Sequence, residues 1–201
     1  MKAFLSVLVA IAIVSEIALL RQNIALKTQL NEKKYLGDQA SNVKRNLERR
    51  VQERRLAGQC LPSWGRKNTE NRETPGLINT KYVILFCFSP TDCGSCIQNE
   101  VAIWNQFSQS KYKADCSVIG ITASADTATI ERLRKTYDFR FPIASVSDFE
   151  TTLLRYGITS TPVILFGDAE QRRIISAFFP NSVEKSSDWF VTQVVSFLTN
   201  C

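Results

Sequence analysis

Residues 82–107 read YVILFCFSPTDCGSCIQNEVAIWNQF, and this stretch decides the fold. Its first seven residues are a continuous apolar run, which is typical of a central strand covered on both faces. Ser89–Asp92 breaks the run, and a helix is then predicted from about Cys93 to Phe107 because apolar residues recur at helical spacing. A strand that leads directly into a helix indicates an α/β domain.

The same alternation of strands and helices continues along the rest of the chain. Further strands are predicted over residues 117–121, 163–166 and 174–178, the last two joined by a turn at Gly167-Asp168. Further helices are predicted directly after Asp126, which caps the first of them, and over residues 149–156 and 183–198. The pattern therefore predicts one α/β domain over residues 59–201, with an irregular lead-in at 60–80.

Cys93-Gly94-Ser95-Cys96 stands where the predicted strand gives way to the helix. Unpaired backbone N–H groups and the positive end of the helix dipole stabilise a thiolate at such a position. We therefore expect Cys93 to be exposed with a lowered pKa, and Cys96 to be shielded. Such a pair attacks a substrate disulfide with its first sulfur and resolves the mixed disulfide with its second. The alternatives are half of a zinc site or a structural disulfide, although the chain has no histidine.

The N-terminal run over residues 3–20 is apolar at fifteen of its eighteen positions. As a helix it is roughly 27 Å long, close to the ~30 Å thickness of the hydrocarbon core of a bilayer. No small-x-small cleavage site follows it, so residues 1–21 are predicted to be an uncleaved transmembrane anchor that contacts the lipid bilayer. The positive-inside rule, applied to Lys2 and to the basic residues from Arg21 onward, would leave the following domain in the cytoplasm.

Residues 22–58 are predicted to form a basic helical stalk. The segment contains no proline, and its apolar residues follow a narrow helical stripe: Leu26, Leu30, Leu36, Val43, Leu47 and Val51. Residues 21–58 contain ten Lys and Arg residues but only four Asp and Glu residues. The difference, +6, equals the net charge of the whole chain. The charge thus describes this segment and does not indicate a nucleic-acid-binding fold. A stalk-mediated coiled-coil dimer, or a basic helix on anionic lipid, are the other interpretations.

A second motif, Ser160-Thr161-Pro162-Val163, places a proline directly before a predicted buried strand, a setting in which cis X-Pro bonds occur. With it, the order of elements over roughly residues 58–200 resembles the thioredoxin fold, a central mixed sheet flanked by helices. With the predicted anchor and stalk, the chain resembles membrane-anchored, TlpA-like thiol-disulfide oxidoreductases of the redoxin group.

The resemblance implies that Cys93 is the nucleophile, that Cys96 resolves, and that the two form a redox-active disulfide. It implies that Thr161 and Pro162 belong to a cis-proline loop that docks the substrate chain by backbone hydrogen bonds. Partners would be disulfide-bearing protein substrates and a membrane thiol electron donor, with no nucleic acid, cofactor or metal. The resemblance also implies an inner-membrane protein whose domain lies on the periplasmic side, against the charge count.

The chain departs from the pattern of thioredoxins at three places. The pair between the cysteines is Gly94-Ser95, without the Pro of thioredoxin. Cys87 stands six residues before Cys93, where thioredoxins carry a buried Asp that assists proton transfer, and it is expected to be a small core residue. Extracytoplasmic relatives often place a Glu three residues after the second Cys, where this chain has Asn99. Glu100 comes next and is expected on the surface. A missing buried acid would slow proton removal from Cys96 without preventing it.

The remaining cysteines, Cys60, Cys116 and Cys201, have no evident partner, although two of them could pair in an oxidising compartment. The three tryptophans are expected to pack in the core or at its rim: Trp64, Trp104 and Trp189.

The leading hypothesis for the activity is an anchored thiol-disulfide oxidoreductase that reduces protein disulfides. A peroxiredoxin-like thiol peroxidase is the second hypothesis, but Pro90-Thr91-Asp92-Cys93 is more closely spaced than the loop of those enzymes. A redox-inert tethered scaffold is the third, and an unreactive Cys93 would identify it.

Overall fold

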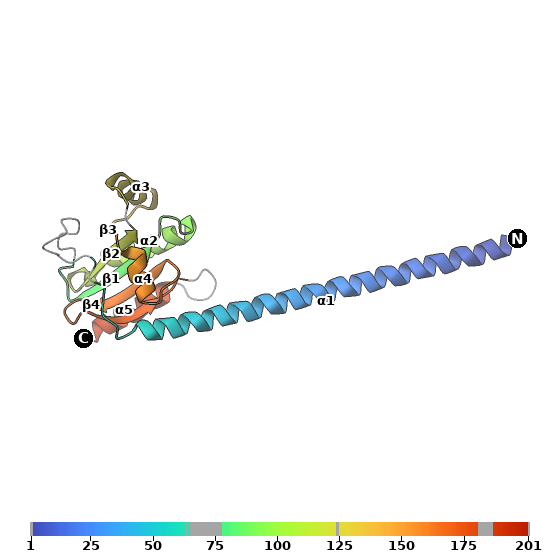
Figure 1. Cartoon of the computed structure of the whole chain (residues 1–201), viewed down its shortest axis with the longest axis horizontal. Helices are drawn as coiled ribbons and strands as arrows, with labels where there is room; N and C mark the ends of the chain where they lie inside the picture. The colour runs from blue at the N-terminus through green and yellow to red at the C-terminus, as the bar shows by residue number, and fades with distance from the viewer. Residues whose placement is uncertain (1, 63, 65–77, 124, 181–186, 201) are drawn as a thin grey trace. The chain divides into compact units, whose positions relative to one another are not determined.

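The computed structural model describes residues 2–62, 64, 78–123, 125–180 and 187–200, with side chains from residue 22 onward except at 24 and 25 (Figure 1). The chain divides into two compact units, residues 1–48 and 49–201. The first unit is the greater part of helix α1 (Lys2–Leu56), so the helix expected over the stalk is present and ends at Leu56. Its apolar stripe is more than half exposed: Leu26, Leu30, Leu36, Val43, Leu47 and Val51.

The predicted membrane anchor belongs to the beginning of α1. In the portion of the chain available for such a search, no helix is both long enough and apolar enough to cross a bilayer. The span predicted over residues 3–20 has side chains outside the described set, and it stays a prediction.

The second unit is built on a mixed sheet of five strands in the order β3-β2-β1-β4-β5 (Figure 1). The strands are β1 (Tyr82–Phe88), β2 (Cys116–Ala123), β3 (Ile143–Val146), β4 (Val163–Asp168) and β5 (Arg173–Phe178). Strand β2 lies parallel to β1 and to β3, whereas β4 is antiparallel to β1 and to β5. The remaining helices are α2 (Gly94–Ser108), η1 (Lys111–Ala114), α3 (Thr127–Tyr137), α4 (Phe149–Arg155) and α5 (Ser187–Thr199). This is the thioredoxin-like α/β arrangement that the sequence predicts.

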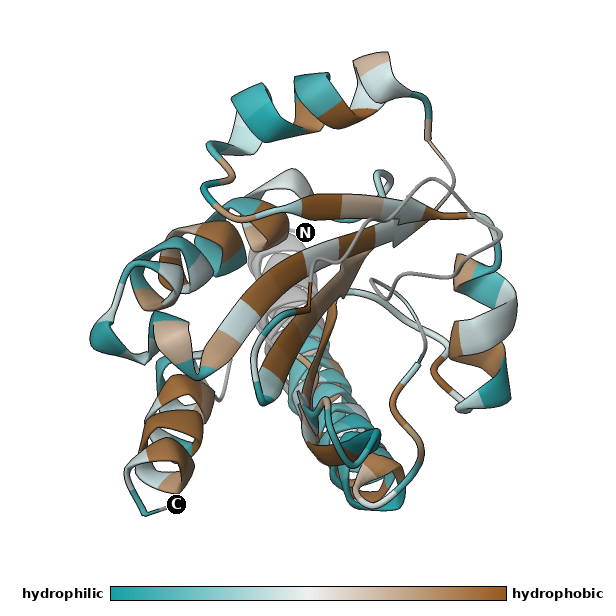
Figure 2. Cartoon of the chain, turned by 90° about the vertical axis from the view of Figure 1, so that its left-hand side faces the viewer, coloured by the Kyte–Doolittle hydropathy of each residue, from teal (hydrophilic) through white to brown (hydrophobic). Residues whose placement is uncertain are grey.

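Alternation along β1 buries both faces of the sheet, because successive side chains of a strand point to opposite sides. Leu85 and Cys87 belong to an apolar cluster that includes side chains of α4 and Leu56 of α1. Phe86 and Phe88 belong to a second cluster, which includes side chains of α2, α3 and α5. Figure 2 shows hydrophobic residues along the central strands, which lie between the helices. The continuous apolar run of β1 follows from this burial on both faces.

The last two turns of α1 belong to the second unit, which begins at residue 49. Leu56 is fully buried in the first apolar cluster, which also contains Leu85, Cys87 and side chains of α4. The side-chain amide of Gln52 donates a hydrogen bond to the backbone carbonyl of Gly157. Just beyond the helix, the N–H of Gly58 donates to the carbonyl of Ile174 in β5 (2.8 Å). These residues are therefore part of the packed core.

The turn predicted at Gly167-Asp168 is wrong, because β4 runs through both residues. The chain turns after them, where the N–H of Gln171 donates to the carboxylate of Asp168 (2.7 Å). A Cβ atom on Gly167 would lie 2.5 Å from a methyl group of Leu61. A side chain at position 167 would thus have to displace the Leu61 methyl group, a tertiary constraint that its sequence neighbourhood does not reveal.

Strand β3 has no counterpart among the predicted strands. It is four residues long, only one of them is fully buried, and it pairs with β2 alone. A segment this short carries too little periodicity to be distinguished from a loop. The final helix, predicted over residues 183–198, is described from Ser187 onward, and residues 181–186 lie outside the described set.

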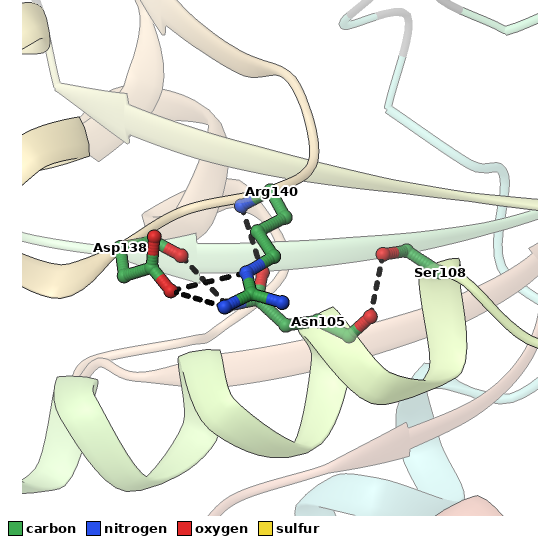
Figure 3. Close-up of polar contacts among 4 residues, drawn as sticks. All are labelled: Asn105, Ser108, Asp138 and Arg140. Carbon is green, nitrogen blue, oxygen red and sulfur yellow. Dashed lines mark hydrogen bonds and ion pairs between the residues drawn. The ribbon is translucent and has the colours of Figure 1, made fainter.

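Asn105 ties helix α2 to the segment that follows α3 (Figure 3). Its side-chain amide donates to the carbonyl of Asp138 (2.7 Å), and its oxygen accepts from the N–H of Arg140 (2.8 Å). Asp138 has a left-handed backbone (φ 53°) and its carboxylate pairs with the Arg140 guanidinium (2.9 Å). These bonds fix the position of α2, whose first turn carries the two cysteines.

Candidate active site

Cys93 is the N-cap residue of α2, directly at the junction between the sheet and the helix. Its carbonyl accepts the first helical hydrogen bond, from the N–H of Ile97 (3.0 Å). The Cys93 side chain is exposed and Cys96, in the first turn, is partly shielded; both are free thiols. The exposed nucleophile and the shielded second thiol therefore have the placement that the motif predicts.

Hydrogen bonding to its sulfur lowers the pKa of Cys93 to about 7, because donors stabilise the thiolate. The Cys96 thiol is the largest contributor, followed by the hydroxyl of Ser95, whose Oγ lies 3.1 Å from the Cys93 sulfur. Backbone N–H groups of the first helical turn contribute in the same direction. The free N–H groups of the helix start thus contribute in the expected direction, but less than the Cys96 thiol and the Ser95 hydroxyl.

The pKa of Cys96 is raised, so the two thiols differ in acidity. The main cause is the hydrogen bond that the Cys96 thiol gives to the Cys93 sulfur. Burial and the negative charges of the Cys93 thiolate and of Asp92 act in the same direction. The pair therefore holds one proton on Cys96 while Cys93 carries the negative charge.

Asp92 joins the cysteine motif to the second predicted motif. One carboxylate oxygen accepts a hydrogen bond from the hydroxyl of Thr161 (2.8 Å), and the other accepts from the N–H of Ser89 (2.8 Å). Thr161 precedes Pro162, and the peptide bond between them is cis. The structure thus brings the two motifs together through a residue that sequence reasoning did not select.

Tyr137, near the end of α3, lies on another side of the cysteine turn. Its phenol oxygen would be 3.4 Å from a Cβ atom placed on Gly94. A larger side chain at position 94 would therefore press against this phenol. Nothing in the helical spacing of Tyr137 distinguishes it from an ordinary apolar residue of α3, so the sequence does not point to this contact.

The surface position predicted for Glu100 is wrong: the side chain is buried. Both of its carboxylate oxygens accept from the hydroxyl of Ser187 (2.6 Å), and one also accepts from the indole N–H of Trp104 (3.2 Å). Burial raises its pKa, and these bonds offset only part of the effect. Glu100 shares its helix face with Ile97 and Trp104, and α5 covers that face.

Cys87 is the fully buried core residue that was expected. Burial raises its pKa and that of Cys116, so both are unreactive thiols. Cys60 is exposed, and Cys201 lies outside the described residues. Trp64 and Trp104 are buried and Trp189 is partly exposed, as their packing roles predict. Among the residues searched, no cluster of three or more Cys, Asp or Glu could hold a metal ion.

No protein-family model and no curated protein matches the chain. Several solved structures match the chain. One is a secreted Mycobacterium tuberculosis disulfide oxidoreductase homologous to E. coli DsbE, which is 18% identical in sequence with a TM-score of 0.42. The match covers 58% of this chain and 81% of that chain. The thioredoxin domain of a Bacteroides vulgatus thiol-disulfide oxidoreductase is 15% identical (58% and 79% covered, TM-score 0.45). A thiol:disulfide interchange protein from Bacteroides sp. is 15% identical (56% and 70%, TM-score 0.44). Likeness at this level assigns no activity, which must come from the site itself.

Proposed function

We propose that this chain is a thiol-disulfide oxidoreductase that reduces protein disulfides through Cys93 and Cys96. The observation that carries the proposal is that the two thiols differ in acidity. Cys93 is exposed and its pKa is lowered to about 7, whereas Cys96, which donates a hydrogen bond to the Cys93 sulfur, is partly shielded and its pKa is raised. At neutral pH about half of the molecules then carry a Cys93 thiolate. Thiolates, not thiols, attack disulfides.

The reaction proceeds in two exchanges. The Cys93 thiolate attacks one sulfur of the substrate disulfide, forms a mixed disulfide, and releases the other sulfur as a thiolate that takes up a proton. Cys96 then loses its proton and attacks the Cys93 sulfur, which releases the second substrate thiol. The substrate disulfide gains two electrons and two protons, and the chain is left with a Cys93–Cys96 disulfide. A thiol donor must reduce this disulfide before the next cycle.

The substrate chain is proposed to dock against Thr161 and Pro162. Support comes from the hydrogen bond that holds the Thr161 side chain to Asp92, the residue before the nucleophile. An extended segment lying along this loop would bring its disulfide next to the exposed Cys93. The proposed substrates are therefore disulfide-bearing proteins.

We further propose that residues 3–20 anchor the protein in the inner membrane, with the thioredoxin-like unit on the periplasmic side and a membrane thiol protein as electron donor. The apolar length of the segment and the absence of a cleavage signal support the anchor. A disulfide-reducing site is useful where disulfides form, outside the cytoplasm, which supports the topology.

Substitution of each thiol tests the proposed chemistry. Cys93→Ser should abolish reduction of a protein disulfide, and Cys96→Ser should accumulate a mixed disulfide because the resolving thiol is missing. Cys60→Ser, which removes the other exposed cysteine that the structure describes, is the matched control and should leave the rate unchanged. The alkylation rate of Cys93 should rise with pH around a midpoint near 7. A Cys93→Ser chain as active as wild type would refute the mechanism, whereas a wild-type Cys93 that reacts with neither alkylating reagents nor disulfides would favour a redox-inert scaffold.

A further inference from the structure

Asp92 is the only acidic residue between β1 and α2, and both of its oxygens are engaged. The N–H of Ser89 donates to Oδ2 and the hydroxyl of Thr161 donates to Oδ1, each at 2.8 Å. The Asp92 N–H in turn donates to the Ser89 carbonyl (3.0 Å), which closes a tight turn. The carboxylate is therefore held in one orientation from within its own loop and from across the site.

The bond to Thr161 spans 69 residues of sequence, so it joins two loops that no local interaction could align. Thr161 immediately precedes Pro162 and β4, whereas Asp92 immediately precedes Cys93. A hydrogen bond to a charged acceptor is stronger than one between neutral groups, which suits it to hold two loops in register. Displacement of Thr161 would move the proposed docking loop relative to the nucleophile.

The charge of Asp92 also acts on one sulfur more than on the other. It is the smallest of the causes that raise the pKa of Cys96, after the hydrogen bond to the Cys93 sulfur, burial and the charge of the Cys93 thiolate. It is not among the causes that shift the pKa of Cys93. The Asp92 charge thus adds to the preference of the proton for Cys96, which the hydrogen bond to Cys93 mainly sets. That proton is the one donated to the Cys93 sulfur.

We propose that Asp92 is the positioning residue of this site, which holds Thr161 in register with Cys93 and keeps a negative charge beside Cys96. The inference rests on the proposed oxidoreductase activity and adds to it a link between docking and thiol chemistry. Neither cysteine spacing nor the Thr-Pro motif predicts this link, because it depends on a side chain outside both.

Two substitutions separate the charge from the geometry. Asp92→Asn removes the charge and keeps an oxygen that can accept one of the two hydrogen bonds. Thr161→Val keeps the shape of the side chain and removes only its hydroxyl, while Thr161→Ser restores that hydroxyl. Thr91→Val is the matched control, since the Thr91 hydroxyl pairs with Ser89 Oγ in the same loop and does not contact Asp92 or Thr161.

The first measurement compares turnover of a protein disulfide with turnover of a small disulfide reagent by the full-length chain. Asp92→Asn and Thr161→Val should lose about tenfold on the protein disulfide relative to the reagent, a factor that corresponds to about 1.4 kcal/mol. Thr161→Ser should recover most of the loss seen in Thr161→Val, and Thr91→Val should keep the wild-type ratio. Wild-type ratios in both Asp92→Asn and Thr161→Val would overturn the proposed register.

The second measurement follows alkylation of each cysteine against pH by mass spectrometry, which needs no turnover. Asp92→Asn should shift the Cys96 profile to lower pH, and Thr161→Val, which retains the charge, should shift it less. An unchanged Cys96 profile in Asp92→Asn would overturn the role of the charge. If the wild-type chain has no reductase activity, the proposed function is refuted. The role of Asp92 is tested separately, because the pH dependence of Cys96 alkylation can still be compared between wild type and Asp92→Asn.

Discussion

Glu100 shows at the scale of one residue how a carboxyl group is held inside this protein. Its oxygens receive hydrogen bonds from Ser187 and Trp104, and burial nevertheless raises its pKa. The nearby carboxylate of Asp188 acts in the same direction. A buried carboxylate whose donors are neutral is costly when ionised, so Glu100 favours its protonated form in the folded chain more than in the unfolded one.

Glu100→Gln should therefore stabilise the protein at high pH and have little effect at low pH. For a carboxyl group whose pKa is raised by folding, the favourable contribution is present below the unfolded pKa. It is lost as the pH rises through the folded pKa. Each unit of pKa elevation corresponds to about 1.4 kcal/mol of unfolding free energy. Urea unfolding of both proteins between pH 4 and 8 measures the difference.

The exposed Glu150 of α4 provides the control for this comparison. Glu150→Gln should follow the wild-type pH dependence. If the stability of Glu100→Gln relative to wild type stays constant between pH 4 and 8, the ionisation of Glu100 is not coupled to folding.

At the scale of secondary structure elements, the position of α2 depends on one amide side chain. Asn105 satisfies the carbonyl of Asp138 and the N–H of Arg140, both in the segment between α3 and β3 (Figure 3). An Asn side chain provides a donor and an acceptor together, as this pair of backbone groups requires.

Asn105→Ala should lower the free energy of unfolding by about 1–3 kcal/mol, because it leaves two backbone groups without their partner. Ser108→Ala, one turn further along α2, is the control, since its hydroxyl donates only to the Asn105 carbonyl. Chemical denaturation of the two variants and wild type measures both effects. Equal destabilisation by both variants would contradict a special role for Asn105.

At the scale of the whole molecule, α1 has two parts with different surroundings. Its stripe of apolar side chains up to Val51 is exposed, whereas Leu56 is fully buried in the second unit. The packed unit therefore begins within the helix, at residue 49.

The proposed anchor gives a prediction for the whole chain produced in a Gram-negative host. The full-length protein should remain in carbonate-washed membranes, and a chain lacking residues 2–21 should be soluble, because the fifteen apolar residues of the segment 3–20 supply the membrane affinity. Protease added to spheroplasts should degrade the thioredoxin-like unit. Protection from the protease until the membrane is broken would instead show that the positive-inside count determines the topology.

The sequence alone determined the elements whose signals are local. The apolar run of β1, the helical spacing of α2 and the capping of α3 by Asp126 depend on neighbours within a few residues. The environment of Cys93 is local as well, because the Cys96 thiol, the Ser95 hydroxyl and the backbone N–H groups that lower its pKa all lie within three residues of it. For that reason its lowered pKa was predictable before the fold was known.

Only the tertiary structure decided features that depend on segments far apart in the chain. Glu100 is buried against α5, whose Ser187 lies 87 residues further along the chain. Asp92 accepts a hydrogen bond from Thr161, which is 69 residues away in sequence. The prediction of a turn at Gly167 was wrong because its close neighbour in space, the Leu61 side chain, belongs to the lead-in before β1. Periodicity and capping report the preferences of the local backbone, whereas these contacts exist only once the sheet has brought distant loops together.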